Sequence, residues 1–288
     1  MSEIDLGHLR ALAAVVDSGS FEQAAAQLHL TPSAVSQRIK ALETSAGRVL
    51  VRRTKPSEIT EAGQSFLRLA RQIGILLDDA SADADPVVVP LAVNADSFTT
   101  WVLPALAPLA DRVSFDIHRE DQDHSEALLR AGTVMAAITS DAQAIQGCSV
   151  TRLGVMRYRA MASPAFASRW LGSGTTEAAL GRAPVIVYDR KDDLQDQFLR
   201  ARSRARLAPP RHHIPGSTDF AESVRLGLGW GMLPDQQSAR IERAGEVIDI
   251  APGVHIDVTL YWQQWTIETP ILEQIASAIR LAAVAALT

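Results

Sequence analysis

Apolar residues near the N-terminus recur with helical spacing. Val35, Ile39, Leu42 and Ala46 are three or four positions apart, which places them on one face of a helix. Together with the alanine-rich segment before them, they predict two short helices joined by a tight turn within residues 20–43. An ordinary amphipathic helix pair with a solvated polar face fits this spacing equally well.

Capping residues define where both predicted helices begin. Ser20 precedes the first helix, and Gln23 follows three residues later, as in a capping box. Thr31 is a good N-cap for the second helix, and Pro32 occupies its first position, where the missing N–H costs nothing. The polar face of this second helix offers hydroxyl, amide and ammonium groups that can reach base edges and phosphates.

A wing is predicted directly after the two helices. Residues 49–60 contain two short extended segments separated by a Pro-Ser turn. Between Leu30 and Thr60 there are six basic and two acidic residues, whereas the whole chain has a net charge of −5. This local excess favours phosphate binding, and a solvated loop would not explain its place beside the candidate recognition helix. The candidate DNA-binding residues are Thr31, Pro32, Ser33, Ser36, Gln37, Arg38, Lys40, Arg52, Arg53 and Lys55.

Beyond residue 60 the sequence predicts a long helix and then alternating strands and helices. Residues 61–79 predict a long amphipathic helix whose apolar stripe is too long for the small winged domain to bury, so we expect it to pair with a second copy. Strands are then predicted at 87–93, 113–119, 135–139 and 184–188. Helices are predicted at 100–110, 124–131, 192–202, 218–226 and 271–287. This alternation indicates an α/β sheet with crossover helices, which binds ligands at the carboxyl ends of its strands.

Composition narrows the class of protein. At 288 residues and 47% hydrophobic residues, the chain can form two or three domains with sizeable cores. The single cysteine, Cys148, excludes an internal disulfide framework and suits a reducing compartment. The N-terminus has no signal-peptide run, and the apolar tail 275–287 contains Arg280, so it predicts a packed helix rather than a membrane span. We expect a soluble cytoplasmic protein with no membrane segment.

Motifs for catalysis are missing from the sequence. The glycine-rich segment 227–231 lacks the spacing of a dinucleotide fingerprint. His212 and His213 are adjacent and would point to opposite faces of a strand, so they are poor joint metal ligands. We expect no enzymatic activity, no cofactor and no metal site.

The N-terminal motifs resemble the LysR-type transcriptional regulators. The segments GSFEQAAAQLHLTPSAVSQRIKALE, GRVLVRRT and ITEAG occur in the order typical of that family, and a long helix follows. One departure is visible: many members carry Phe before the Arg-Thr pair, where this chain has Leu50-Val51-Arg52. The resemblance implies a winged helix-turn-helix domain at 1–60, a dimerising linker helix at 61–80, a hinge at 81–86 and an effector-binding domain at 87–288. It also implies that this last domain has two α/β lobes hinged like a periplasmic binding protein, with lobe 1 at about 87–160 and 267–288 and lobe 2 at about 161–266.

Polar residues follow the first strand of the effector-binding domain. Ser97, Thr99 and Thr100 lie where a helix begins, and their hydroxyls, with the helix N–H groups, can bind a carboxylate. Simple capping needs only one such residue, so we favour a ligand role. Asp219 lies in the first turn of another helix, either as an acid that stabilises the helix dipole or as the partner of a ligand ammonium group; both remain open.

Three further segments, NADSFTTW, GLGWGMLP and YWQQW, resemble the LysG and ArgP branch of the family. This implies sensing of a basic amino acid (lysine, arginine or histidine) and activation of an amino-acid exporter gene. A cationic side chain in a cleft needs a carboxylate partner, but the sequence leaves open which acid provides it. The candidate effector-binding residues are Asp96, Ser97, Thr99, Thr100, Trp101, Glu120, Asp121, Thr139 and Asp219.

The resemblance also implies partners. They are double-stranded DNA, a basic amino acid, RNA polymerase and a second copy of the chain, with dimer against tetramer left open. Effector binding would close the lobes and shift the geometry of the oligomer on DNA. Three alternatives stay open: a DNA-architectural protein without effector response, a solute-binding module whose N-terminal domain serves only in assembly, and a LysR-type regulator that senses a different small anion.

Overall fold

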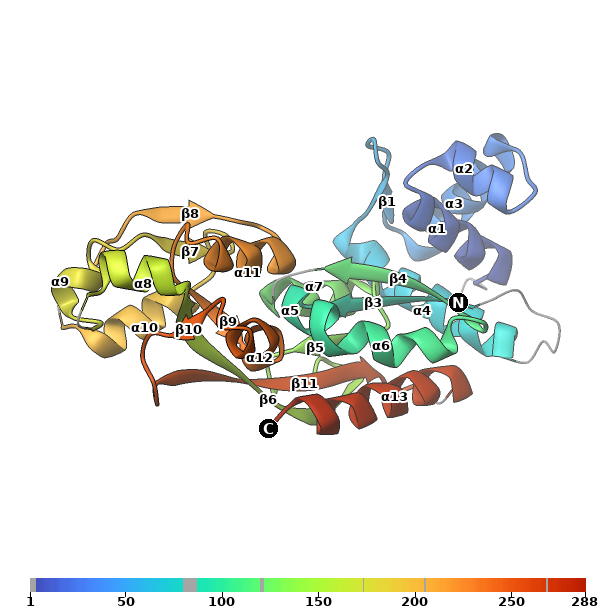
Figure 1. The fold of residues 1–288 in the computed structure, drawn as a ribbon. Coiled ribbons are helices and arrows are strands. Elements are labelled where there is room, and N and C mark those ends of the chain that lie inside the picture. The colour runs from blue at the N-terminus through green and yellow to red at the C-terminus, as the bar shows by residue number, and fades with distance from the viewer. Residues whose placement is uncertain (1–3, 80–86, 120–121, 173, 205, 268) are drawn as a thin grey trace.

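The computed structural model describes residues 4–79, 87–119, 122–172, 174–204, 206–267 and 269–288. Its N-terminal domain consists of α1 (Leu6–Ser18), α2 (Phe21–Gln27), α3 (Pro32–Ala46) and a hairpin of β1 (Val51–Arg52) and β2 (Glu58–Ile59). The hairpin stands beside the three helices as a wing (Figure 1). The predicted helix-turn-helix and wing are therefore both present.

The predicted caps define the ends of α2 and α3. The Ser20 hydroxyl accepts a hydrogen bond from the Gln23 amide at 3.2 Å, and the Thr31 hydroxyl accepts one from the Ala34 amide at 3.2 Å. One face of α3 carries Val35, Ile39 and Leu42, which are fully buried against α1 and α2. Burial of this stripe leaves the polar side of α3 facing solvent.

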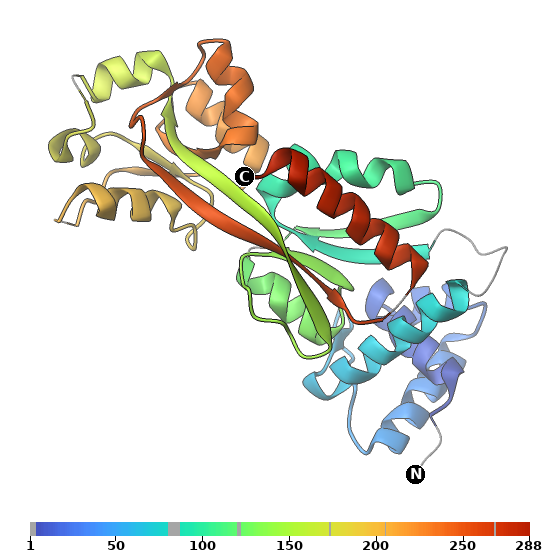
Figure 2. The same ribbon diagram turned by 90° about the horizontal axis from the view of Figure 1, so that it is seen from below.

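The helix α4 (Glu61–Asp79) lies between the winged domain and the first part of the large domain (Figure 2). It packs against α1 on one side and against α7 (Gln122–Ala131) on the other. The predicted hinge, residues 81–86, lies outside the described residues. Within the parts of the chain that the structure describes, α4 is thus the element that contacts both domains most extensively.

One sheet runs through the large domain in the strand order β10-β6-β11-β5-β3-β4, with β9 also pairing with β6. Its strands are β3 (Val87–Val93), β4 (Val113–Arg119), β5 (Ala136–Thr139), β6 (Cys148–Ala162), β9 (Gly231–Pro234), β10 (Ile248–Asp249) and β11 (His255–Trp265). The strand β3 is parallel to β4 and β5, whereas β11 is antiparallel to β5 and β6. The long strands β6 and β11 carry the chain between two lobes (Figures 1 and 2).

The first lobe contains β3–β5 and a set of helices that pack on them. These are α5 (Ala95–Ser97), the π-helix η1 (Phe98–Val102), α6 (Leu103–Leu106), the 3-10 helix η2 (Ala107–Leu109), α7 and α13 (Pro270–Ala286). The second lobe contains β7 (Val185–Val187), β8 (Arg211–His213), β9, β10 and the helices α8 (Pro164–Trp170), α9 (Glu177–Leu180), α10 (Leu194–Arg202), α11 (Ser217–Arg225) and α12 (Asp235–Arg243). The segment from Tyr261 to Gln264 pairs with β5 and so lies in the sheet of the first lobe, not in the second lobe as expected from the sequence.

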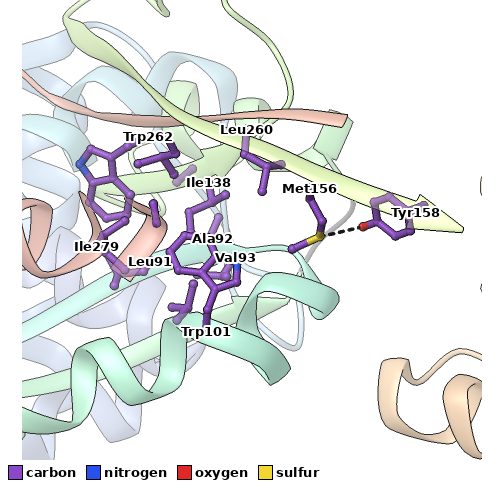
Figure 3. Close-up of a cluster of buried hydrophobic side chains, with 14 of the residues drawn as sticks. Leu91, Ala92, Val93, Trp101, Ile138, Met156, Tyr158, Leu260, Trp262 and Ile279 are labelled. Atoms are coloured by element: carbon purple, nitrogen blue, oxygen red, sulfur yellow. Dashed lines mark hydrogen bonds between the residues drawn. The ribbon is translucent and has the colours of Figure 1, made fainter. Parts of the chain in front are cut away.

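A buried apolar cluster holds the first lobe to the two long strands. Figure 3 shows Leu91 and Ile138 packed with Trp262 and Ile279, while Tyr158 lies at the edge of the cluster, where its hydroxyl approaches the Met156 sulfur. Side chains of β6 thus belong both to the core and to the space between the lobes. None of the described helices is long and apolar enough to span a lipid bilayer.

Candidate functional site

The exposed face of α3 is the first candidate site. Ser33, Gln37 and Lys40 are exposed and Ser36 is half-buried, on the side opposite the buried stripe. Two of the predicted DNA-binding residues have other contacts. The Thr31 hydroxyl caps the helix and lies 3.0 Å from the Ser33 hydroxyl. Arg38 is turned toward α1, because a Cβ atom added at Gly7 would lie 3.5 Å from its Nη1.

The wing adds positive charge beside α3. Arg52, Arg53 and Lys55 are all exposed, as is Pro32 at the start of the helix. The Arg53 guanidinium lies 5.0 Å from the centre of the Phe21 ring, a cation–π distance that orients this side chain. A polar helix face flanked by exposed cations matches the requirements for reading a groove and holding phosphates.

The second candidate site is a cavity of about 670 Å³ between the two lobes. Asn94, Asp96 and Arg119 line it from the first lobe. Asp192 and Ser217 are among the residues that line it from the second lobe. Such a volume is suited to a small molecule, and side chains from both lobes would surround it.

Asp96 joins the lobes on the wall of this cavity. Its Oδ1 accepts a hydrogen bond from the Ser217 hydroxyl at 2.6 Å, and its Oδ2 accepts one from the Tyr158 hydroxyl at 2.8 Å. Burial raises the pKa of the Asp96 carboxyl, and the two hydroxyl donors partly offset this. The side-chain amide of Gln237 donates through Nε2 to the Ser217 backbone carbonyl at 2.9 Å, which fixes the start of α11.

A second carboxylate, Asp192, lines the same cavity from the other lobe. Its Oδ2 accepts from the Tyr188 amide at 2.8 Å and its Oδ1 from the Leu194 amide at 3.2 Å. Burial raises the pKa of Asp192, and the negative charge of Asp96 raises it further. The charged residues that line the cavity are Asp96, Asp189, Asp192 and Asp193 with Arg119 and Lys191, so negative charge is in excess.

Several predicted effector-binding residues do not line this cavity. The Thr100 hydroxyl donates to the Asp96 carbonyl at 2.6 Å, and the Thr99 hydroxyl donates to the Ala95 carbonyl at 3.0 Å. Ser97 is fully buried, and its hydroxyl has no hydrogen-bond partner among the described residues. In this structure the three hydroxyls therefore do not form a carboxylate pocket on the cavity wall.

Of the other five predicted residues, three lie away from the cavity wall and two fall outside the part of the chain that the structure describes. Trp101 is buried in the core of the first lobe, and the buried Thr139 donates to the Asp141 carbonyl at 3.1 Å. Asp219 is exposed beside Gly216 and is not among the residues that line the cavity. Glu120 and Asp121 lie outside the described residues. Of the predicted acids, Asp96 is the one that the structure places on the cavity wall.

Sequence reasoning missed Asp192, Ser217 and Tyr158. Asp192 follows β7 closely, so the rule that ligands bind at the carboxyl ends of strands could have found it. Ser217 begins α11, in the turn where only Asp219 was considered. Tyr158 gave no such signal, because it lies within the long strand β6, which the sequence pattern did not predict.

Comparisons with known proteins agree with this architecture. The model of the bacterial regulatory helix-turn-helix protein of the lysR family matches residues 6–64, and the LysR substrate binding domain matches residues 89–282. The lysine export transcriptional regulatory protein LysG of Corynebacterium glutamicum is 38% identical over 283 residues, which cover 96% of this chain and 97% of the relative.

Two solved structures are similar over nearly the whole chain. The crystal structure of ArgP from Mycobacterium tuberculosis has a TM-score of 0.89 and 43% identity, covering 99% of both chains. Full-length LysG from Corynebacterium glutamicum with the bound effector Arg has a TM-score of 0.78 and 36% identity, covering 98% of this chain and 99% of the other.

Proposed function

The chain belongs to the LysR family of bacterial helix-turn-helix regulators, and on this premise we propose that it is a DNA-binding transcriptional regulator whose activity is set by a basic amino acid. The carrying observation is the pair Asp96 and Asp192, which line one cavity from opposite lobes. The two carboxylates are half-buried, and the charge of Asp96 raises the pKa of Asp192, so a ligand cation between them would stabilise both in their charged form. Arginine and lysine provide such a cation.

The rest of the cavity suits the backbone of an amino acid. Arg119, at the end of β4, is the cation of the first lobe that lines the cavity, and we assign to it the ligand α-carboxylate. Arg is the effector named for the similar LysG structure, and it carries both a side-chain cation and an α-carboxylate. An amino acid with a neutral side chain brings no second cation to these carboxylates, so we expect it to bind more weakly than arginine or lysine.

On DNA, we assign base recognition to α3 and phosphate contacts to the wing. Two copies pair through α4, because Leu69 and Leu76 of this helix are exposed in the isolated chain. The dimer then places two α3 helices in adjacent major grooves. We infer that the lobes move about β6 and β11 in the manner of a periplasmic binding protein. The effector favours one lobe arrangement and so shifts the oligomer on DNA toward contact with RNA polymerase. The names of the LysG relatives make an amino-acid exporter gene the expected target.

The test combines binding selection with calorimetry. The full-length protein selects duplexes from a random library, and the enriched duplex is footprinted with and without L-arginine. Calorimetry then compares L-arginine, L-lysine, L-histidine and L-leucine. We expect a defined protected site, a footprint that changes with L-arginine, and binding of the cationic amino acids only. Equal binding of L-leucine would contradict the cationic effector, and protection spread over all sequences would favour an architectural protein.

Charge removal at Asp192 tests the carrying observation directly. Asp192→Asn keeps the shape of the side chain and should weaken L-arginine binding by about 2–5 kcal/mol, the usual effect of removing one partner of a buried charge pair. Asp196→Asn removes an acid of the same lobe that pairs with Arg211 and does not line the cavity, and it should bind normally. If both variants bound L-arginine like the wild type, the cation site would have to lie elsewhere.

A further inference from the structure

One arginine of the linker helix contacts both domains. The Arg71 guanidinium donates through Nη2 to the Asp17 carboxylate, in the last turn of α1, and through Nη1 to the Gly132 carbonyl, in the turn between α7 and β5. The Arg71 side chain is 9% exposed and the Asp17 side chain 46% exposed. A single buried cation therefore connects the DNA-binding domain to the first lobe.

The backbones also approach closely at this point. Gly132 has a φ of 70°, and a Cβ atom there would lie 2.8 Å from the backbone nitrogen and Cα of Arg68. Arg68 adds a contact to the same lobe, because its Nη1 donates to the Gln146 carbonyl at 3.3 Å. Only a residue without a side chain allows α4 to lie this near the α7–β5 turn.

Two helices extend from this contact toward the two candidate sites. Arg119 lines the cavity between the lobes, and α7 begins three residues later and ends one residue before Gly132. On the other side, α1 packs against α3 in one apolar core. Helices are stiff elements, so α7 and α1 are placed to pass a displacement from one site to the other.

We propose that Arg71 is a positioning residue that couples the cavity between the lobes to the recognition helix. It holds α1 against the α7–β5 turn, so that a displacement of α7 when an effector binds reorients the DNA-binding domain. The Asp17 side chain is 46% exposed, so water can solvate its charge when Arg71 is replaced, and the contact links two domains rather than the core of either one. The inference rests on the proposed function for the effector and for DNA binding.

The first test uses Arg71→Gln and Asp17→Asn in the full-length protein. Arg280→Gln is the matched control, because it removes an exposed ion pair with Glu273 within α13. For each variant we measure Tm, the Kd for L-arginine by calorimetry, and the affinity for the selected duplex with and without L-arginine. We expect Tm and the L-arginine Kd to stay near wild-type values, while the ratio of duplex affinities with and without L-arginine falls by about threefold or more in both variants. An unchanged ratio in Arg71→Gln would overturn the proposal.

A pair of glycines separates contact from backbone strain. Gly132→Ala and Gly245→Ala each put a side chain at a positive φ, 70° and 73°, but a Cβ at Gly245 meets nothing within 4 Å. Both should lose stability through strain. Only Gly132→Ala should also lose the effector-dependent ratio, since it alone pushes α4 from the first lobe. Equal ratios in the two variants would count against a role for this contact.

Hydrogen exchange provides a readout that does not depend on the effector. Without L-arginine, Arg71→Gln should raise the exchange rate of the amides around Gly132 several-fold, whereas Arg280→Gln should not. If the wild type failed to bind L-arginine, the proposed effector would be wrong, and exchange would still decide whether Arg71 holds the two domains together. Unchanged exchange in Arg71→Gln would show that it does not.

Discussion

The Ser217 hydroxyl donates a 2.6 Å hydrogen bond to Asp96 across the gap between the lobes, although the two residues are 121 positions apart in the chain. Ser217 begins α11 of the second lobe, and Asp96 lies in α5 of the first. The Thr99 hydroxyl reaches the same serine at 3.2 Å. The start of α11 is thus bonded directly to the segment after β3, so the lobe arrangement and the position of the Asp96 carboxylate depend on each other.

Ser217→Ala should therefore weaken effector binding. The variant removes a hydrogen bond to a charged group, which contributes about 1.5–3 kcal/mol, so the Kd for L-arginine should rise tenfold or more. The matched control is Ser223→Ala in the same helix, because the Ser223 hydroxyl donates only to the Asp219 carbonyl of its own helix. Calorimetry on both variants checks this. Similar Kd values in the two would mean that Ser217 has no special role.

Effector binding should depend on pH in a direction that follows from the two carboxylates. Burial raises the pKa of both Asp96 and Asp192. Only the ionised carboxylates attract a cation, so acidification should weaken L-arginine binding at a higher pH than expected for exposed aspartates, whose pKa is about 3.9. For the fold stability of the ligand-free protein, acidification has the opposite effect. A carboxyl whose folded pKa is raised stabilises the fold below its unfolded pKa, and this contribution is lost as pH rises through the folded value.

Calorimetry and thermal unfolding over a pH series check both directions. Acidification from neutral pH should weaken L-arginine binding and should lessen the unfavourable contribution of the two acids to the free energy of unfolding. Asp192→Asn should flatten both dependences, since it removes one of the two titrating groups. A pH-independent Kd for L-arginine in the wild type would contradict ionised carboxylates as the cation partners.

The DNA-binding domain could be predicted closely from the sequence because its signals are local. Caps at Ser20 and Thr31, the proline at the start of α3 and a stripe with helical spacing each depend on residues within one or two turns. The orientation of Arg38 could not be predicted in this way. It depends on α1, which lies some thirty residues earlier in the chain and approaches α3 only in the folded domain.

The cavity was predicted less well because its residues come together through long-range contacts. Hydroxyls at Thr99 and Thr100 matched a carboxylate pocket by composition, but both donate to backbone carbonyls of the preceding turn. The long strands β6 and β11 pass through both lobes and bring Tyr158 to Asp96, which no local pattern indicates. Asp192 could have been inferred from its place after β7. That it shares a cavity with Asp96 depends on how the two lobes face each other.

The proposed roles of α3 and the wing predict different DNA-binding defects. Gln37→Ala should reduce discrimination between the selected duplex and variants of it by about 1–3 kcal/mol at one position. Arg53→Ala should weaken binding to all duplexes and reduce the salt dependence by about one unit of slope. Arg240→Ala, an exposed arginine of α12 in the second lobe, controls for the loss of one positive charge. Salt titrations with matched and altered duplexes check this, and identical behaviour of Gln37→Ala and Arg53→Ala would refute the division of roles.

Stability of the second lobe should depend on Arg159 more than on its neighbour Arg157. The Arg159 guanidinium contacts Asp235, Glu242 and Asp249 and is 21% exposed, so it ties α12 and β10 to β6. Among the described residues, the ion pair of Arg157 is with Asp257, and the two side chains are 36% and 39% exposed. Arg159→Met should lower the free energy of unfolding by about 1–3 kcal/mol because several acids lose their partner, whereas Arg157→Met should lower it by less than about 1 kcal/mol. Denaturant unfolding of the two variants compares them; equal losses would mean that the Arg159 cluster adds no stability.

Assignment of the ligand α-carboxylate to Arg119 predicts a change in ligand preference. Agmatine is arginine without its carboxylate, so the ratio of agmatine Kd to L-arginine Kd measures how much the carboxylate contributes. A charge-assisted hydrogen bond contributes about 1.5–3 kcal/mol, and the wild type should therefore prefer L-arginine by tenfold or more. Arg119→Gln should reduce this ratio toward one by weakening L-arginine binding and leaving agmatine binding nearly unchanged.

The matched control for this comparison is Arg130→Gln. Arg130 is an exposed arginine of α7 that pairs with Glu126 and does not line the cavity, so its replacement should keep the wild-type ratio. Arg119 acts on one end of the ligand only, whereas Asp96 and Asp192 act on the cation that agmatine shares with arginine. Loss of affinity for both ligands in Arg119→Gln would therefore argue for a general electrostatic or structural role, and an unchanged ratio would place the carboxylate elsewhere in the cavity.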